Sequence, residues 1–527
     1  MRMRSDPGPQ GDGKRRRRGV YAAIMGGGLG GGLALLLLAL VVMTPTWTPL
    51  TNPLAAPAPT APTPTAQGAA LPTATTTSLP PLAASVAPDM SWPTYMGQSG
   101  RSGFNGAETT LTAATIAHLT VRRQLHAGGA IFAQPVVANG TIYWGAWDGY
   151  ERATSVATGR NVWARYLGQT SVISCEGAVV GVSSTATLAY EPVDGRRTLV
   201  VFVGGGSGNF YALNAATGAV VWRTRLGQPP AAYLWSSPAY DAGAIYMGVA
   251  SLGDCPLVQG RVVKLSAATG GVEATFNAVP NGCVGGTVWG SVAVDPNTGV
   301  VYVGTGNQGA CAAAEPYADA VLALRASDLG LIGAWQAAAA LAMFDSDFGS
   351  TPTLFTARIG GAMRHLVGIV NKNGTYYAFD AARISAGPLW TRQVSNPANC
   401  PACGDGGFAP GAWDGHLLYE PGGKTTVRGA PCPAGLFALN PANGAVVWSA
   451  CYPGPTFATL AMGPGYLIIG AAPRLQVVST QGAAAGRVLY TFHDPRAPST
   501  YFWGAPSVAD GMVVVGDADG NLFVLGR

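Results

Sequence analysis

Charged residues are scarce in this chain. Of its 527 residues only 11 % are Asp, Glu, Lys or Arg, and the formal net charge at pH 7 is +5. Residues 1–18 hold one lysine and six arginines against Asp6 and Asp12, so the net charge of this stretch equals that of the whole chain. Residues 19–527 are therefore near neutral, which excludes the basic surface that a nucleic-acid partner requires.

Histidines are few, and two common motifs are absent. The five histidines are scattered, which favours neither a three-histidine metal site nor a hydrolase triad. No C-x-x-C-H sequence occurs, so we expect no covalently attached c-type haem. The glycine-rich run at 204–209 lies between strand patterns and does not precede a helix, which excludes a phosphate-binding loop there.

Hydrophobic residues, glycine and proline are abundant. The chain is 48 % hydrophobic and holds 74 glycines and 39 prolines, without the strict period of collagen. The hydrophobic content is too high for a disordered chain. A turn-rich, all-β protein is the expected class.

The N-terminal region predicts a membrane anchor. Residues 19–43 form an uncharged run rich in Leu, Val and Gly that follows the basic residues 1–18. About 20 apolar residues span a bilayer, and the preceding Lys/Arg block keeps the N-terminus in the cytoplasm. We expect 1–18 to be a cytoplasmic stub, 19–43 a transmembrane helix, and the rest to be exported. The alternative is a signal peptide that is cleaved, leaving a secreted protein.

A stalk and one large folded domain follow. Residues 44–90 are mostly Pro, Thr, Ala and Leu, with almost no charge. Proline favours extended conformations, and the segment lacks the periodic apolar pattern needed to bury a core. We expect a disordered stalk over 44–90 and a folded domain over 91–527.

The folded domain is built from repeats. The clearest copies read FYALNAATGAVVW at 210–222 and LFALNPANGAVVW at 436–448. Weaker copies end near Trp163, Trp335 and Trp390. A spacing of about 40 to 55 residues, with four short strand signals per unit, is typical of a β-propeller blade. The Asn-x-x-x-Gly sequence should turn between the last two strands, and the Trp should pack between blades.

The number of units predicts eight blades. Seven whole units start near residues 131, 179, 233, 286, 350, 407 and 457, and 504–526 holds only three strand signals. Residues 119–127 have no other partner and would supply the missing outer strand. This closure would remove the open sheet edge. A seven-bladed ring is the alternative.

Several segments resemble a known family. Residues 285–307, GGTVWGSVAVDPNTGVVYVGTGN, resemble the segment of pyrroloquinoline quinone (PQQ) dehydrogenases whose Trp stacks on the cofactor and whose Asn binds the metal. Residues 317–324 resemble the polyvinyl-alcohol dehydrogenase branch, and 344–354 resemble the segment that carries the catalytic aspartate. Residues 371–380 resemble the segment whose Lys or Arg contacts the quinone oxygens. The resemblance, which begins with SWPTYMG at 91–97, implies an eight-bladed propeller of the PQQ-repeat superfamily.

The resemblance implies a role for each matched residue. It places Trp289 and Thr287 against PQQ and Asn307 on a Ca²⁺ ion. Asp347 matches the catalytic base and a metal ligand, and Lys372 matches the group that contacts the quinone. Independently of the family, a flat quinone needs a broad aromatic surface, and Ca²⁺ needs oxygen ligands.

The chain departs from the family pattern at two places. Many alcohol-oxidising quinoproteins carry two adjacent cysteines beside the cofactor, and this chain has none. The second acidic metal ligand of the family precedes a glycine like Gly260, where this chain has Cys255, with Asp254 one place earlier. Asp254 is therefore the candidate for that ligand.

The eight cysteines all follow the predicted membrane segment, where an oxidising compartment permits disulfides. Cys400 and Cys403 have no second metal-ligand pair nearby, which favours a local disulfide over a zinc site. Pairs 432–451 and 283–311 are plausible loop bridges.

Two function classes remain open from the sequence. The first is a membrane-anchored enzyme that oxidises an alcohol with PQQ and Ca²⁺ and passes electrons to a separate acceptor. Its substrate would be a small molecule or a polymer. The second is a non-catalytic propeller of the same repeat type that acts as a protein-binding or assembly scaffold at the cell surface. Convergence of Trp289, Asn307, Asp347 and Lys372 on the central channel would favour the enzyme.

Overall fold

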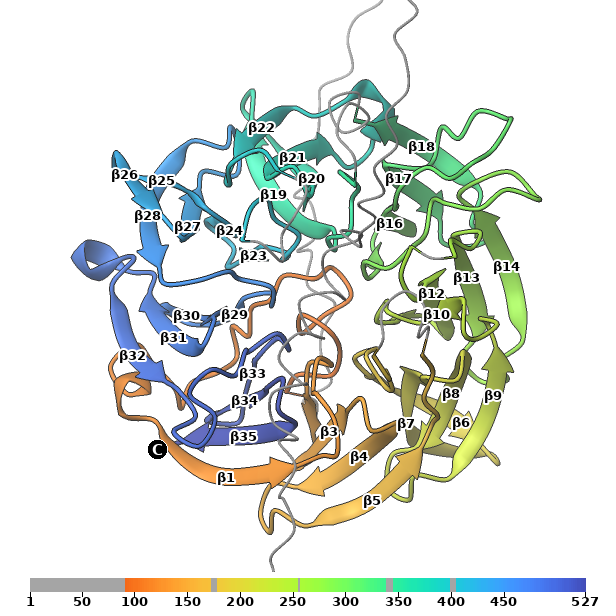
Figure 1. Ribbon diagram of the computed structural model, residues 1–527, viewed down its shortest axis with the longest axis horizontal. Coiled ribbons are helices and arrows are strands. Elements are labelled where there is room, and N and C mark those ends of the chain that lie inside the picture. Colours follow the sequence, from red (N-terminus) through yellow and green to blue (C-terminus); the bar gives the residue numbers. More distant parts are fainter. Residues whose placement is uncertain (1–90, 172–177, 255, 338–344, 399–403) are drawn as a thin grey trace, which may run out of the picture. The chain divides into compact units, whose positions relative to one another are not determined.

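The computed structural model describes residues 91–527 apart from 172–177, 255, 338–344 and 399–403. The described strands form eight antiparallel sheets arranged as blades around a central axis (Figure 1). The eight-bladed, all-β prediction is confirmed, and the seven-bladed alternative is wrong. The predicted stub, membrane helix and stalk lie outside the described residues. Within the described part of the chain, no helix has the length and apolar character needed to cross a bilayer.

The first four blades follow the chain order. Blade 1 comprises β2 (Val136–Ala138), β3 (Thr141–Gly145), β4 (Tyr150–Ser155) and β5 (Asn161–Tyr166). Blade 2 comprises β6 (Thr187–Val193), β7 (Arg196–Gly204), β8 (Asn209–Asn214) and β9 (Val220–Arg225). Blade 3 comprises β10 (Ala232–Tyr233), β11 (Ala239–Asp241), β12 (Ala244–Ser251), β13 (Arg261–Ser266) and β14 (Val272–Asn277). Blade 4 comprises β15 (Ala293–Asp295), β16 (Val300–Gly304), β17 (Ala320–Arg325) and β18 (Leu331–Gln336).

The next three blades continue around the ring. Blade 5 comprises β19 (Thr353–Ile359), β20 (Ala362–Val370), β21 (Thr375–Asp380) and β22 (Trp390–Gln393). Blade 6 comprises β23 (Ala412–Trp413), β24 (Leu418–Gly422), β27 (Ala434–Leu439) and β28 (Val446–Tyr452), with a separate hairpin of β25 (Thr425–Val427) and β26 (Ala430–Cys432). Blade 7 comprises β29 (Ala461–Gly463), β30 (Tyr466–Ala471), β31 (Arg474–Ser479) and β32 (Val488–Phe492). Short 3₁₀ helices are η1 (Ile116–His118), η2 (Ile384–Ala386) and η4 (Gly482–Ala484).

Blade 8 closes the ring with strands from both ends of the folded domain. It comprises β33 (Ser507–Ala509), β34 (Met512–Gly516), β35 (Asn521–Gly526) and, as its outer strand, β1 (Thr120–His126). The strand β1 runs antiparallel to β35, with Thr120 opposite Gly526 and His126 opposite Asn521 (Figure 1). The predicted closure by residues 119–127 is therefore confirmed, and β1 covers the edge of β35 that would otherwise be unpaired.

The repeated Gly and Trp of each unit form the joint between neighbouring blades. Gly218 has a positive φ of 67°, and a Cβ there would lie 2.6 Å from Trp163 of the preceding blade. Gly270 receives Trp222 in the same way, at 2.4 Å. The indole of Trp163 also donates to the carbonyl of Ala215 at 2.8 Å. Two features of this turn require glycine. The backbone has a positive φ, and the indole occupies the space that a side chain would need.

A segment that we call the rim segment, residues 92–105, joins all eight blades. Its backbone and side chains form hydrogen bonds to the inner strand of each blade in turn. The blade residues that it bonds are Val137, Leu188, Tyr240, Val294, Leu354, Trp413, Met462 and Val508. Because this segment meets every blade, it fixes the blades relative to one another.

Arg101 anchors the rim segment. Its side chain is fully buried and donates to the carbonyls of Val292 at 2.8 Å, Pro238 at 2.9 Å and Tyr95 at 2.7 Å, and to the hydroxyl of Thr94 at 3.0 Å. The guanidinium group therefore links blades 3 and 4 to the rim segment, which passes beside the central cavity at Tyr95.

Two predicted disulfides are present. Cys283 bonds Cys311, with Cα atoms 5.4 Å apart, and Cys432 bonds Cys451, with Cα atoms 5.6 Å apart. Cys400 and Cys403 lie outside the described residues, so their predicted bridge stays a prediction.

Candidate functional site

A central cavity of about 220 Å³ lies where the inner strands begin. In every blade, the residue four places before the inner strand lines this cavity. These eight equivalent residues, in blade order, are Phe132, Ser183, Trp235, Trp289, Gly349, Phe408, Phe457 and Trp503. The repeat therefore brings one position of each unit to the axis, and aromatic residues hold six of the eight positions.

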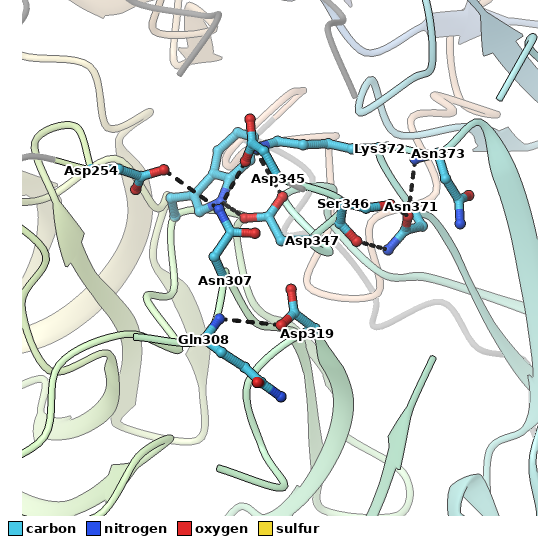
Figure 2. A network of polar contacts seen from close by, with 11 residues as sticks. Asp254, Asn307, Gln308, Asp319, Asp345, Ser346, Asp347, Asn371, Lys372 and Asn373 are labelled. Atoms are coloured by element: carbon cyan, nitrogen blue, oxygen red, sulfur yellow. Dashed lines mark hydrogen bonds and ion pairs between the residues drawn. The ribbon is translucent and has the colours of Figure 1, made fainter. Parts of the chain in front are cut away.

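A polar cluster occupies one side of the cavity, at blades 4 and 5. The Nζ atom of Lys372 lies 2.6 Å from Oδ1 of Asp345 and 3.0 Å from Oδ1 of Asp347. All three side chains are buried, with exposed fractions of 8 % for Lys372 and Asp345 and 2 % for Asp347. Figure 2 shows the two carboxylates on either side of the Lys372 ammonium group. The predicted pair of Asp347 and Lys372 is thus in direct contact.

Trp289 joins this cluster to the aromatic side of the cavity. Its indole Nε1 donates to Oδ2 of Asp347 at 2.9 Å, and the Lys372 ammonium lies 5.0 Å from its ring centroid. Its ring meets that of Phe408 edge to face, with centroids 5.7 Å apart. A Cβ on Gly349 would lie 1.6 Å from the Trp289 ring. Glycine at the blade 5 position therefore makes room for the indole.

Asn307 and Asp254 complete the cluster. The side-chain amide of Asn307 donates to Oδ1 of Asp345 at 2.8 Å and to Oδ2 of Asp254 at 3.4 Å (Figure 2). Thr287 is buried and lines the cavity. Its carbonyl accepts from Gly306 at 2.7 Å, next to Asn307 in the chain. The structure therefore brings together all six residues that the sequence singled out.

Local backbone contacts hold the two charged segments together. The backbone N–H of Lys372 donates to the carbonyl of Asp347 at 3.1 Å. On the residues just before these two, the Asn371 amide donates to the carbonyl of Ser346 at 2.8 Å, and the Ser346 hydroxyl bonds the Asn371 side chain at 3.1 Å (Figure 2). These bonds hold the loop before β19 next to the turn after β20. They therefore set the distance between the Asp347 carboxylate and the Lys372 ammonium group.

Two acidic residues of the site were not predicted. The sequence did not single out Asp345, yet its side chain accepts bonds from both Lys372 and Asn307. Its φ of 55° is unusual for a residue other than glycine. The signal available in the sequence was its position two residues before Asp347, which leaves both carboxylates on one short loop.

Asp319 is the second missed residue. It lies in the 317–324 segment, is buried, and accepts from the backbone N–H of Gln308 at 3.2 Å. Burial, helped by the charge of Asp347, raises the pKa of Asp319 to about 7. Gln308 belongs to the same loop as Gly306, which packs beside Asp347. By bonding Gln308, Asp319 therefore holds the loop that contacts Asp347.

Burial also sets the protonation of the central pair. Burial, together with the charge of Asp345, raises the pKa of Asp347 to about 6, although Lys372 and the Trp289 hydrogen bond act in the opposite direction. Burial lowers the pKa of Lys372, but the charges of Asp347 and Asp345 raise it by more, so its net shift is upward. At neutral pH the cluster thus holds a fixed cation beside a carboxylate whose pKa lies close to the ambient pH.

Comparisons with known proteins agree with this geometry. Residues 263–391 match the family model for the glucose/ethanol/alcohol dehydrogenase β-propeller domain of PQQ proteins. Over 470 residues the chain is 26 % identical to polyvinylalcohol dehydrogenase of a Pseudomonas species, covering 77 % of this chain and 70 % of that protein.

Solved structures show the same fold. A quinohemoprotein alcohol dehydrogenase from Comamonas testosteroni superposes with a TM-score of 0.63 at 17 % identity, covering 83 % of this chain and 81 % of that chain. A europium-containing methanol dehydrogenase superposes with a TM-score of 0.66 at 16 % identity, covering 84 % and 98 %. The chain is therefore an eight-bladed β-propeller that matches the alcohol dehydrogenase propeller model over residues 263–391 and is similar in sequence to polyvinylalcohol dehydrogenase.

Proposed function

We propose that this protein is a PQQ-dependent dehydrogenase that oxidises an alcohol and passes the electrons to a separate acceptor. The observation that carries the proposal is the convergence of Trp289, Asp347 and Lys372 from two blades on one cavity. Asn307 is bonded to the lining residue Asp345. A purely structural propeller has no need for a buried Lys between two carboxylates at its axis, because burying charged groups costs free energy even when they are paired.

The residues fit a quinone with a divalent cation. Trp289 offers an aromatic surface to the cavity, and the side chains of Asn307, Asp254 and Asp347 provide oxygen ligands of the kind that Ca²⁺ prefers. Among the described lining residues the charged ones are three aspartates and Lys372. A divalent cation would balance this negative excess. When bound, PQQ and Ca²⁺ would supply a two-electron acceptor and a Lewis acid.

Asp347 is the general base in this proposal. One carboxylate oxygen is fixed by the indole N–H of Trp289, and the other, Oδ1, has no hydrogen-bond partner apart from its ion-pair contact with Lys372. A carboxylate in this setting accepts the hydroxyl proton of the alcohol. Its pKa of about 6 keeps it ionised at neutral pH while leaving it a useful base.

Lys372 and Asp345 prepare the site for charge that develops during oxidation. The raised pKa of Lys372 keeps it cationic throughout. Its ammonium group therefore orients Asp347 and stabilises negative charge in the cavity. Asp345 holds Lys372 from the other side and orients the Asn307 amide.

The location of the protein remains part of the proposal. The basic residues 1–18 followed by the apolar run 19–43 support a single membrane anchor with the propeller outside the cytoplasm. The disulfides Cys283–Cys311 and Cys432–Cys451 support an oxidising compartment.

Reconstitution tests the proposed activity. PQQ added with Ca²⁺ to the purified full-length protein should quench the tryptophan fluorescence of the protein. The loaded protein should then reduce an artificial dye when a primary or secondary alcohol is added. Omission of either PQQ or Ca²⁺ should abolish dye reduction. Failure of PQQ to quench fluorescence would contradict the enzyme and favour a non-catalytic scaffold at the cell surface.

A further inference from the structure

A disulfide joins the loop that carries Asn307 to the loop before it in the chain. Cys283 belongs to the loop between β14 and β15, and Cys311 belongs to the loop between β16 and β17. The backbone N–H of Gly286 donates to the carbonyl of Asn307 at 2.8 Å. The disulfide therefore fastens two loops whose backbones already contact each other.

A buried carboxylate faces this disulfide. Glu315 lies in the same loop as Cys311 and is 7 % exposed. A carboxylate oxygen of Glu315 and the sulfur atoms of Cys283 and Cys311 all lie within 4.8 Å of one another. Oε2 of Glu315 accepts the backbone N–H of Gly309 at 2.9 Å, whereas Oε1 is buried and has no hydrogen-bond partner. Leaving a buried oxygen without a partner costs free energy, so the fold gains no stability from placing Oε1 there.

These three side chains have the composition of a zinc site once the sulfurs are reduced. Thiolates and carboxylates are ligands of Zn²⁺, and soft sulfur ligands favour it over Ca²⁺ and Mg²⁺. Two sulfurs bound to one tetrahedral Zn²⁺ lie about 3.8 Å apart, a distance that Cα atoms 5.4 Å apart allow. The Gly309 N–H holds the carboxylate in one orientation, as outer hydrogen bonds do around metal ligands.

The bridge Cys432–Cys451 lacks such a neighbour. In the part of the chain that the structure describes, no His, Asp, Glu or third Cys brings a ligand atom within 4.8 Å of both of its sulfurs. The buried carboxylate of Glu315 therefore distinguishes the first disulfide from the second. Cys283 and Cys311 are also partly exposed, so a small reductant can reach them.

We propose that reduction of the Cys283–Cys311 disulfide opens a Zn²⁺ site formed by the two thiolates, Glu315 and a water molecule. This inference does not depend on the proposed dehydrogenase. A two-electron reductant, either a dithiol or a phosphine, breaks the S–S bond and is itself oxidised to a disulfide or to a phosphine oxide. Each cysteine sulfur takes a proton from the dithiol or from water and releases it when Zn²⁺ binds the thiolate. The bound ion then holds the two loops together in place of the covalent bond.

Zinc content tests the site directly. The full-length protein is reduced with a phosphine, freed of metal and dialysed against micromolar Zn²⁺, and the bound zinc is determined by elemental analysis. The reduced chain should retain one Zn²⁺ more than the reduced variant Cys283→Ser/Cys311→Ser, a comparison that subtracts zinc bound elsewhere. Before reduction, the two chains should bind zinc equally. Equal zinc content after reduction overturns the proposal.

A second variant tests the third ligand and keeps both cysteines, which guards against misfolding. Glu315→Gln should weaken the affinity of the reduced chain for Zn²⁺ by at least about tenfold, and circular dichroism checks the fold. Asp328→Asn, at an exposed aspartate paired with Arg325, is the matched control and should leave the affinity unchanged. An unchanged affinity in Glu315→Gln would show that the buried carboxylate is not a ligand and overturns the proposed site.

Cobalt identifies the sulfur ligands. Co²⁺ added to the reduced chain in place of Zn²⁺ should give the charge-transfer absorption of thiolate-bound cobalt, and Zn²⁺ should displace it. Cys432→Ser/Cys451→Ser should retain this absorption in full, whereas Cys283→Ser/Cys311→Ser should lose it. The opposite pattern would assign the metal to the other bridge and overturn the proposal.

Discussion

In blade 5 the residue four places before the inner strand is Gly349, whereas in blade 7 it is Phe457. The first leaves space that Trp289 fills, with Asp345 and Asp347 just before it in the chain. The second fills its own space with a ring that packs against the ring of Phe408. One backbone position, repeated eight times, thus yields a charged site on one side of the axis and an apolar wall on the other.

The difference shows how a repeat fold acquires a single site. Every blade offers the same place at the axis, so a site arises where one unit departs from the others. Blade 5 departs by losing its aromatic residue and gaining two acids, and the turn after β20 adds Lys372. The remaining blades keep the aromatic residue, apart from Ser183 in blade 2.

The largest expected effect comes from removing the base on the charged side. Asp347→Asn should lower kcat by about 10³-fold, because general-base catalysis contributes about that much. Dye reduction with saturating alcohol measures it, and circular dichroism checks the fold. Asp328→Asn, at a solvent-exposed aspartate paired with Arg325, is the control and should leave kcat unchanged. Full activity in Asp347→Asn would show that the charged side is not the catalytic side.

A change in the rim segment should lower the stability of the whole propeller, on the charged side and the apolar side of the axis alike. Arg101→Met should lower the free energy of unfolding by about 3 kcal/mol, since the carbonyls of Val292 and Tyr95 lose the donor that Arg101 supplies. The Pro238 carbonyl keeps its bond from the Thr187 hydroxyl. Denaturant titration measures this loss, with Arg223→Met as an exposed control. An unchanged midpoint would mean that the rim segment does not hold the blades together.

Filling the space at Gly349 should make blade 5 more like its neighbours. In Gly349→Ala the new methyl group overlaps the Trp289 ring, so we expect PQQ affinity to fall by about tenfold and stability by about 2 kcal/mol. Fluorescence quenching gives the affinity. Gly271→Ala is the matched control, because only the Thr269 hydroxyl lies near its added methyl. Equal PQQ affinity in the two variants would contradict the close packing of Trp289.

The smallest expected effect is a change in the pH dependence of stability, and it comes from a buried acid in another blade. Glu151, in β4 of blade 1, is fully buried, and neither carboxyl oxygen has a hydrogen-bond partner. Burial raises the pKa of Glu151 to about 8, against the opposing charge of Arg152. Because the folded state binds this proton more tightly than the unfolded state, the stability that it contributes is lost as the pH rises through about 8.

Glu151→Gln isolates this pH effect. Denaturant titrations at pH 6, 7, 8 and 9 should show the unmodified chain losing about 1 kcal/mol more than the variant between pH 7 and 9. Glu273→Gln, at a partly exposed ion pair with Lys264, should keep the original pH dependence. Parallel curves for Glu151→Gln and the unmodified chain would mean that Glu151 is paired after all.

Much of the fold could be predicted because its signals are local and repeated. The Asn-x-x-x-Gly-x-x-x-Trp phrase marks the outer strands of the blades, and the three strand signals at 504–526 indicated that residues 119–127 complete the last sheet. The pairings Cys283–Cys311 and Cys432–Cys451 were also anticipated. Each of these features depends on residues that are close in the sequence or on the number of strands that each blade requires.

The candidate site was predicted in part. Resemblance to a family identified Trp289, Asp347 and Lys372, which line the cavity, and Asn307, which is bonded to the lining residue Asp345. It missed Asp345, because an aspartate in a loop is indistinguishable in sequence from a turn residue. It also missed the other aromatic rings that line the cavity, since each ring is unremarkable within its own unit.

The sequence by itself determined the class of the fold, the number of repeats and the residue types that carry the chemistry, because strand periodicity and turn residues act over short distances. Only the tertiary structure decided which residues share the axis. Packing of blade 4 against blade 5 brings Trp289 to Asp347, 58 positions later in the chain. Closure of the ring brings Phe132 of blade 1 to Trp503 of blade 8, and these rings stack with centroids 5.2 Å apart. Such contacts depend on the rotation from one blade to the next, which no single repeat encodes.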